Sequence, residues 1–151
     1  MNTKTGAALY PAIDPPNWPA SLAPVEPGVR PLCDALNALP DTYTLWSCEG
    51  HPGREAKPFV TFIAPQDIAF SLSRLIECSP YLKFNWVLTA GFREDGSLQY
   101  TLRPSDIRLN RQWFSWWSRK QWSHDKMCAE LLRLAQLVAR ESVPTKGIPN
   151  E

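Results

Sequence analysis

Three side chains that can bind a metal ion, attack an electrophilic carbon or transfer a proton lie within four positions of the chain. They are Cys48, Glu49 and His51, in the segment TYTLWSCEGHPG that spans residues 42–53. This segment begins with β-branched and aromatic residues, which favour a strand, and ends with glycine and proline, which favour a turn. We therefore expect a strand end that presents a thiol, a carboxylate and an imidazole together.

Two interpretations of this turn need no catalysis. In the first, the turn is purely structural, and Cys48 packs as a small hydrophobic side chain on the strand face that it shares with Thr44 and Trp46. In the second, the turn is a ligand pocket in which backbone N–H groups bind an anion or the polar edge of a ligand. The ligand-binding residues are then five consecutive ones: Ser47, Cys48, Glu49, Gly50 and His51.

A third interpretation is a small enzyme. Cys48 would be the nucleophile and His51 its base, or Glu49 and His51 would transfer protons. A nucleophilic cysteine needs a neighbour that stabilises its thiolate and a further group that orients the base. Three residues apart across a turn, the thiol and the imidazole can meet.

A fourth interpretation is a zinc-stabilised protein-interaction module. The chain has two histidines, each with a cysteine nearby, in the pairs Cys48-x2-His51 and His124-x3-Cys128. Side chains at i and i+4 project from one face of a helix. The two pairs would complete a tetrahedral zinc shell of two thiolates and two imidazoles if the last helix crossed the turn.

The charge of the chain is unevenly distributed. Its formal net charge is +1, but residues 103–140 contain eight basic and three acidic residues. Within them, RLNRQWFSWWSRKQW (108–122) mixes arginine and lysine with tryptophan, a combination that suits phosphates and unpaired bases. Packing in the core or against the N-terminal residues is the favoured explanation of the tryptophans, and an interface with a protein partner or a second copy is another. The candidate contacts are Arg111, Trp116, Arg119, Lys120 and Trp122.

Hydrophobic periodicity predicts the order α-β-β-α-β-β-α. This order is that of an α+β two-layer sandwich, a four-stranded sheet with helices on one face. Prolines bound the first helix, and its leucines recur at the spacing of a buried stripe. In the last helix, Ser123 is a candidate cap, and one face carries Cys128, Leu131, Leu132, Ala135 and Val138. The expected helices are 31–39, 65–79 and 109–142, divided near 123, and the expected strands are 42–48, 58–64, 84–92 and 98–102.

The last two strands are expected to form a hairpin with a defined register. Their apolar residues alternate, and only a three-residue loop at 94–96 places both apolar sets on the same face. This loop pairs Phe92 with Leu98, and it puts Gly96 at the left-handed position that such loops require.

Length and composition predict one domain. The chain has 151 residues, of which 44% are hydrophobic and 21% charged, as in ordinary globular proteins. We expect a proline-rich extended arm at 1–28, a single α+β domain at 29–142 and a flexible tail at 143–151. The sequence has no apolar run of about 20 residues and no signal-peptide core, so we expect a soluble cytoplasmic protein with reduced thiols and no membrane contact.

Residues 36–62 carry a resemblance to a known family. A Leu-Pro pair, the Ser-Cys-x-Gly-His turn and a Pro-x-Val-x-Phe strand resemble small, largely uncharacterised bacterial and phage-borne proteins. The strand-ending Ser-Cys-x-Gly is also distantly similar to the signature of wybutosine-synthesis methyltransferases, which modify a guanosine in transfer RNA with S-adenosylmethionine. The nearer resemblance implies a shared site architecture and no activity. The distant motif continues with a basic residue where this chain has His51, so methyl transfer is not inferred.

The leading hypothesis from the sequence is a binding domain whose pocket forms at the Ser-Cys-Glu-Gly-His turn. Its expected ligand is a nucleotide or a nucleic-acid element, with the basic tryptophan segment as one wall. The small enzyme and the zinc module are the alternatives.

Overall fold

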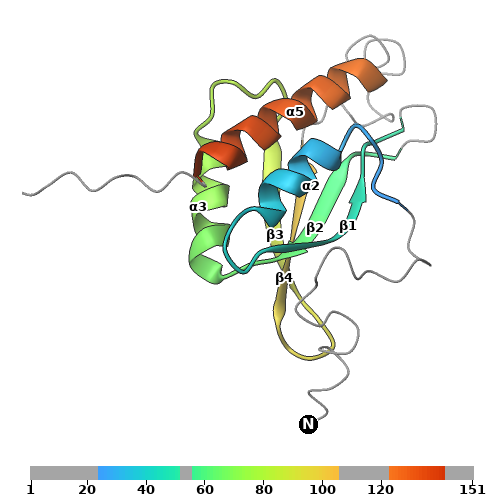
Figure 1. The fold of residues 1–151 in the computed structure, drawn as a ribbon. Coiled ribbons are helices and arrows are strands. Elements are labelled where there is room, and N and C mark those ends of the chain that lie inside the picture. The colour runs from blue at the N-terminus through green and yellow to red at the C-terminus, as the bar shows by residue number, and fades with distance from the viewer. Residues whose placement is uncertain (1–23, 52–55, 106–122, 142–151) are drawn as a thin grey trace, which may run out of the picture.

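The computed structural model describes residues 24–51, 56–105 and 123–141, and within them it confirms the expected α+β order (Figure 1). The basic tryptophan segment, with the first part of the last predicted helix, lies outside these described ranges. So do the predicted tail and most of the predicted arm. The elements are α2 (Arg30–Asn37), β1 (Tyr43–Cys48), β2 (Phe59–Ile63), α3 (Gln66–Glu77), β3 (Trp86–Phe92), β4 (Leu98–Pro104) and α5 (His124–Glu141). None of these helices is long and apolar enough to cross a membrane.

The four strands form one antiparallel sheet in the order β1-β2-β4-β3. Buried residues from α2, α3 and α5 join those of one sheet face in a single hydrophobic core. Val60 of β2 pairs with Leu102 of β4, and both are almost fully buried under the helices. In Figure 1, α2 and α5 lie next to each other across this face. This arrangement brings the start of α5 towards the strand that carries the reactive turn.

A β-bulge in β1 decides which side chains face the helices. Thr44 pairs with Phe62, but Trp46 pairs with Thr61, so Leu45 is an extra residue in the ladder. Thr44 consequently turns towards α2, where its backbone N–H donates to Asn37 Oδ1 at 2.8 Å. The expectation that Cys48 shares a face with both Thr44 and Trp46 was therefore wrong for Thr44. A bulge shifts the two-residue alternation by one position, and no residue type in this stretch announces it.

The β3–β4 hairpin has the predicted register. Phe92 pairs with Leu98, and the N–H of Arg93 donates to the carbonyl of Ser97 at 2.9 Å, which leaves a three-residue loop. Gly96 has φ +82°, the left-handed conformation that this loop requires. Phe92 itself is 79% exposed, because the tip of the hairpin extends beyond the helices that cover the rest of the face (Figure 1).

Helix α5 begins where the sequence predicts it. The hydroxyl of Ser123 accepts a hydrogen bond from the N–H of Lys126 at 3.3 Å, as a cap does. Of the predicted face, Leu131, Ala135 and Val138 are buried and Cys128 is partly buried, but Leu132 is 47% exposed. The helix is rotated so that its buried stripe also includes Met127, Glu130, Leu134 and Leu137, which places Leu132 at the edge.

A buried carboxylate attaches α5 to the loop before β3. Glu130 has no exposed surface, and its Oε1 accepts from the backbone N–H groups of Lys83 at 2.6 Å and Phe84 at 2.9 Å and from the indole of Trp86 at 3.4 Å. Its Oε2 accepts from Arg133 at 2.8 Å. A buried charge is tolerated when its hydrogen bonds are made in this way. The contact fixes α5 two turns away from its first residue.

Glu130→Gln should lower the free energy of unfolding by about 2–4 kcal/mol, because the neutral amide weakens charge-assisted hydrogen bonds and places an N–H₂ group against Arg133 or the loop N–H groups. Urea denaturation followed by circular dichroism measures this loss. The matched control is Glu77→Gln on exposed α3 surface, which should change stability by less than about 0.5 kcal/mol. Equal, small losses in both variants would show that Glu130 does not anchor the helix.

Candidate metal centre

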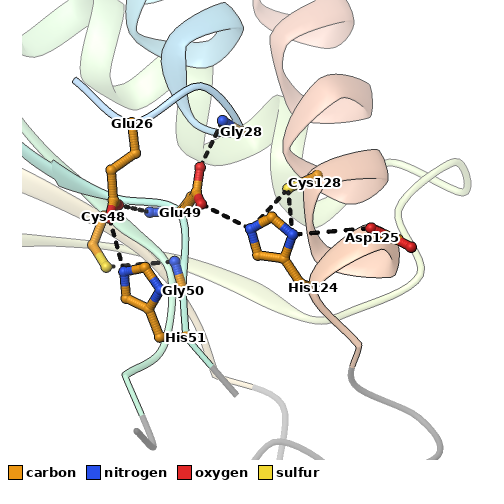
Figure 2. Close-up of polar contacts among 9 residues, drawn as sticks. All are labelled: Glu26, Gly28, Cys48, Glu49, Gly50, His51, His124, Asp125 and Cys128. Atoms are coloured by element: carbon orange, nitrogen blue, oxygen red, sulfur yellow. Dashed lines mark hydrogen bonds and ion pairs between the residues drawn. The ribbon is translucent and has the colours of Figure 1, made fainter. Parts of the chain in front are cut away.

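Two groups of side chains of the types that bind metal ions lie side by side at the end of β1 (Figure 2). Each group contains one glutamate, one cysteine and one histidine, and in each the three ligand atoms all lie within 4.8 Å of one another. We call Glu49, His124 and Cys128 the inner cluster, and Glu26, Cys48 and His51 the outer cluster. The glutamate side chain is 12% exposed in the inner cluster and 33% exposed in the outer one.

The inner cluster joins β1 to α5. Glu49 follows the last residue of β1, and its Oε1 lies 2.7 Å from Nε2 of His124, the first residue of α5. Cys128, one helical turn further along, has its Sγ at 3.6 Å from Nε2 and 3.8 Å from Nδ1 of the same imidazole. The predicted i, i+4 pair on this helix is therefore confirmed as a neighbouring thiol and imidazole, and the last helix does reach the turn.

Gly28 holds the second oxygen of the Glu49 carboxylate. Its backbone N–H donates to Oε2 at 2.7 Å, so both oxygens of this nearly buried side chain are hydrogen-bonded. A Cβ atom at Gly28 would lie 2.5 Å from the Sγ of Cys128 and 2.8 Å from that Oε2. These distances are too short for real contacts, so a glycine is required for the backbone to approach the inner cluster this closely.

The outer cluster is built in a similar way from the segment before α2 and the turn after β1. Oε1 of Glu26 lies 2.8 Å from Nε2 of His51, and its Oε2 accepts from the backbone N–H of Glu49 at 2.8 Å. The thiol of Cys48 accepts from the N–H of Gly50 at 3.4 Å. Gly50 has φ +89°, so this turn too requires a glycine.

The electrostatics favour an imidazolium–carboxylate pair in the inner cluster and a protonated thiol in each cluster. The hydrogen bond between Glu49 and His124 lowers the pKa of the Glu49 carboxyl group and raises the pKa of the His124 imidazole. Burial raises the pKa of Cys48 and of Cys128, and the charge of Glu49 raises both further. A nucleophilic cysteine needs the opposite shift.

The structure groups the predicted metal ligands differently from the expected shell of two thiolates and two imidazoles. Cys48 and His51 belong to the outer cluster, whereas His124 and Cys128 belong to the inner one, and a glutamate completes each. Of the predicted ligand-binding residues, Cys48, Glu49, Gly50 and His51 are brought together (Figure 2). Ser47 pairs with Val60 on the helix-facing side of the sheet and belongs to neither cluster. The predicted contacts Arg111, Trp116, Arg119, Lys120 and Trp122 lie outside the described residues.

Sequence reasoning missed Glu26 and Gly28, which it assigned to an extended arm. Glu26 precedes a proline and a glycine that begin a turn leading into α2, and nothing in its local pattern indicates a partner 25 residues away.

Comparisons with models of known protein families, with curated proteins and with solved structures found no match for this chain.

Gly28→Ala should lower the free energy of unfolding by about 1–3 kcal/mol, because the added methyl group overlaps the thiol of Cys128 and the carboxylate of Glu49. Chemical denaturation in the presence of a chelator measures the effect. Gly91→Ala in β3 is the matched control, because a Cβ there meets no atom within 4 Å. A Gly28→Ala variant as stable as the Gly91→Ala variant would contradict the close approach.

The Glu49–His124 pair should make stability depend on pH in a defined window. The carboxylate has a lowered folded-state pKa, so its contribution is present above its usual value of 4.5 and is lost as the pH falls through the lowered pKa. The imidazole has a raised pKa, so its contribution is fully present below its usual value of 6.5 and is lost as the pH rises through the raised pKa. The stability difference between the wild type and Glu49→Gln, measured with chelator present, should therefore be largest between these two values. A difference that is constant with pH would show that the pair is not ionised.

Proposed function

We propose that this domain binds a zinc ion at the inner cluster, through Glu49, His124 and Cys128. One observation carries the proposal: three ligand atoms of the types that zinc prefers converge within 4.8 Å from elements 75 residues apart in the chain. The ion would tie the end of β1 to the start of α5. This corresponds to the zinc-stabilised module among the sequence-based hypotheses, with a different set of ligands.

The spacing of the ligand atoms suits a tetrahedral ion. Zinc bonds of about 2.0–2.3 Å separate tetrahedral ligands by about 3.3–3.7 Å. The distance of 3.6 Å between Cys128 Sγ and His124 Nε2 falls in this range. The distance of 2.7 Å between Glu49 Oε1 and His124 Nε2 must open by less than about 1 Å, as a hydrogen bond is replaced by two metal bonds. Oε2 of Glu49 can keep its bond from Gly28, which orients the carboxylate as outer-shell partners do.

Charge also favours a cation at this position. A carboxylate and a thiolate together balance the charge of a divalent ion, and a metal-bound thiol is deprotonated. The raised pKa of Cys128 means that its thiol is protonated in the metal-free protein. The thiol would lose this proton when a cation binds. All four cysteines are free thiols in the structure, which suits a reducing compartment, and a cytoplasmic location remains part of this proposal.

Three protein ligands leave one coordination position for water, a ligand or a side chain of a partner. A bound zinc ion supplies Lewis acidity at that position. The nucleotide or nucleic-acid ligand expected from the sequence remains a proposal for the same turn. Its basic and aromatic contacts fall outside the described residues, so metal binding is the function that the described geometry favours.

Purified full-length protein should bind zinc stoichiometrically, and His124→Ala and Cys128→Ala should each weaken the affinity of this site by at least about 100-fold, because each removes one of three ligands. Isothermal titration calorimetry of the chelator-treated protein measures the affinity, and elemental analysis gives the bound metal. Zinc should also raise the melting temperature of the wild type, since it binds only the folded state.

Cys78→Ala is the matched control, because Cys78 is an exposed thiol after α3 and belongs to neither cluster. Circular dichroism of each variant with chelator present separates loss of a ligand from loss of the fold. A Cys128→Ala variant that binds zinc as tightly as the wild type would refute the inner cluster as a zinc site.

A further inference from the structure

We infer that the outer cluster, Glu26, Cys48 and His51, is a second site for a divalent transition-metal ion. The proposal goes beyond the zinc site of the inner cluster, with which it shares no ligand, and it stands or fails separately.

The ligand atoms of the outer cluster converge from three positions. Glu26 lies in the segment before α2, Cys48 is the last residue of β1, and His51 forms the isolated bridge with Ala56. Glu26 Oε1 and His51 Nε2 lie 2.8 Å apart, and the thiol of Cys48 lies within 4.8 Å of both. Thiolate, imidazole and carboxylate together are the ligand types of zinc sites.

Each of these ligands is already held by the backbone around it. Oε2 of Glu26 accepts from the N–H of Glu49 at 2.8 Å, which leaves Oε1 directed at the imidazole. The N–H of His51 donates to the carbonyl of Ala56 at 2.7 Å, and Cys48 is fixed by pairing with Phe59 in the sheet. A site whose ligands are ordered in advance loses less conformational entropy when it binds.

The exposure of the outer cluster allows an ion to enter from solvent. The side chains of His51 and Glu26 are 35% and 33% exposed, whereas in the inner cluster that of Glu49 is 12% exposed and that of His124 is 50% exposed. One carboxylate and one thiolate balance a divalent charge here as well, so two filled clusters would carry little net charge to repel each other. Because its carboxylate is more exposed to water than that of Glu49, the outer cluster should be the weaker of the two sites.

The test is a titration of chelator-treated full-length protein with cobalt(II), a probe whose bond to a thiolate gives a charge-transfer absorption. The wild type should bind two equivalents, and Glu26→Gln and His51→Ala should each remove the weaker one. Cys48→Ala and Cys128→Ala should each remove about half of the thiolate absorption, because each cluster contains one cysteine. Cys78→Ala, the control thiol, should leave both the stoichiometry and the absorption unchanged.

The outcomes separate the two proposals. One equivalent in the wild type that is lost in His124→Ala and kept in His51→Ala would overturn the second site and leave the inner site intact. One equivalent lost in His51→Ala and kept in His124→Ala would support the outer site and refute the inner one. Two equivalents that persist in both Glu26→Gln and His51→Ala would also overturn the inference. Glu26→Gln keeps the size of the side chain, and circular dichroism verifies the fold of each variant.

Discussion

The site depends on two glutamates, each of which uses one oxygen for an imidazole and the other for a backbone N–H on the other's segment. Glu26 binds His51 and the N–H of Glu49, while Glu49 binds His124 and the N–H of Gly28. Partly buried carboxylates are expensive unless their oxygens are hydrogen-bonded. This reciprocal pairing therefore fixes the segment before α2 against the end of β1 and places both imidazoles. Either carboxylate, if moved, would release a backbone donor beside the other.

The chemistry of the clusters follows from what these carboxylates do to the thiols beside them. A negative charge and partial burial keep a thiol protonated, which opposes nucleophilic attack. The same carboxylate becomes an advantage when a cation arrives, because it then shares the ion with the thiolate. An arrangement that opposes nucleophilic attack by Cys48 and Cys128 is thus compatible with the metal binding that we propose. For this reason the described geometry favours metal binding over covalent catalysis.

The position of His124 depends on a residue that touches neither cluster. Glu130 is buried two turns along α5, where it accepts hydrogen bonds from the loop that leads into β3. Packing of apolar side chains alone permits a helix to slide or rotate, whereas a buried charge with several donors has few alternative positions. Together with the cap at Ser123, this contact directs the first turn of α5 at Glu49. A stable fold and a formed site are therefore linked through one helix.

Local patterns in the sequence were sufficient for the helices and strands of the described residues, the hairpin register at Phe92 and Leu98, and the gathering of reactive side chains at residues 48–51. These features depend on neighbours a few positions apart, whose periodicity and turn chemistry can be read directly. Tertiary structure alone decided the bulge in β1, the rotation of α5 and the two cluster memberships. Glu26 meets its histidine across 25 residues and Glu49 across 75, and such contacts arise only when separate elements pack on one sheet. The sequence determined which reactive groups were present, and long-range packing chose their partners.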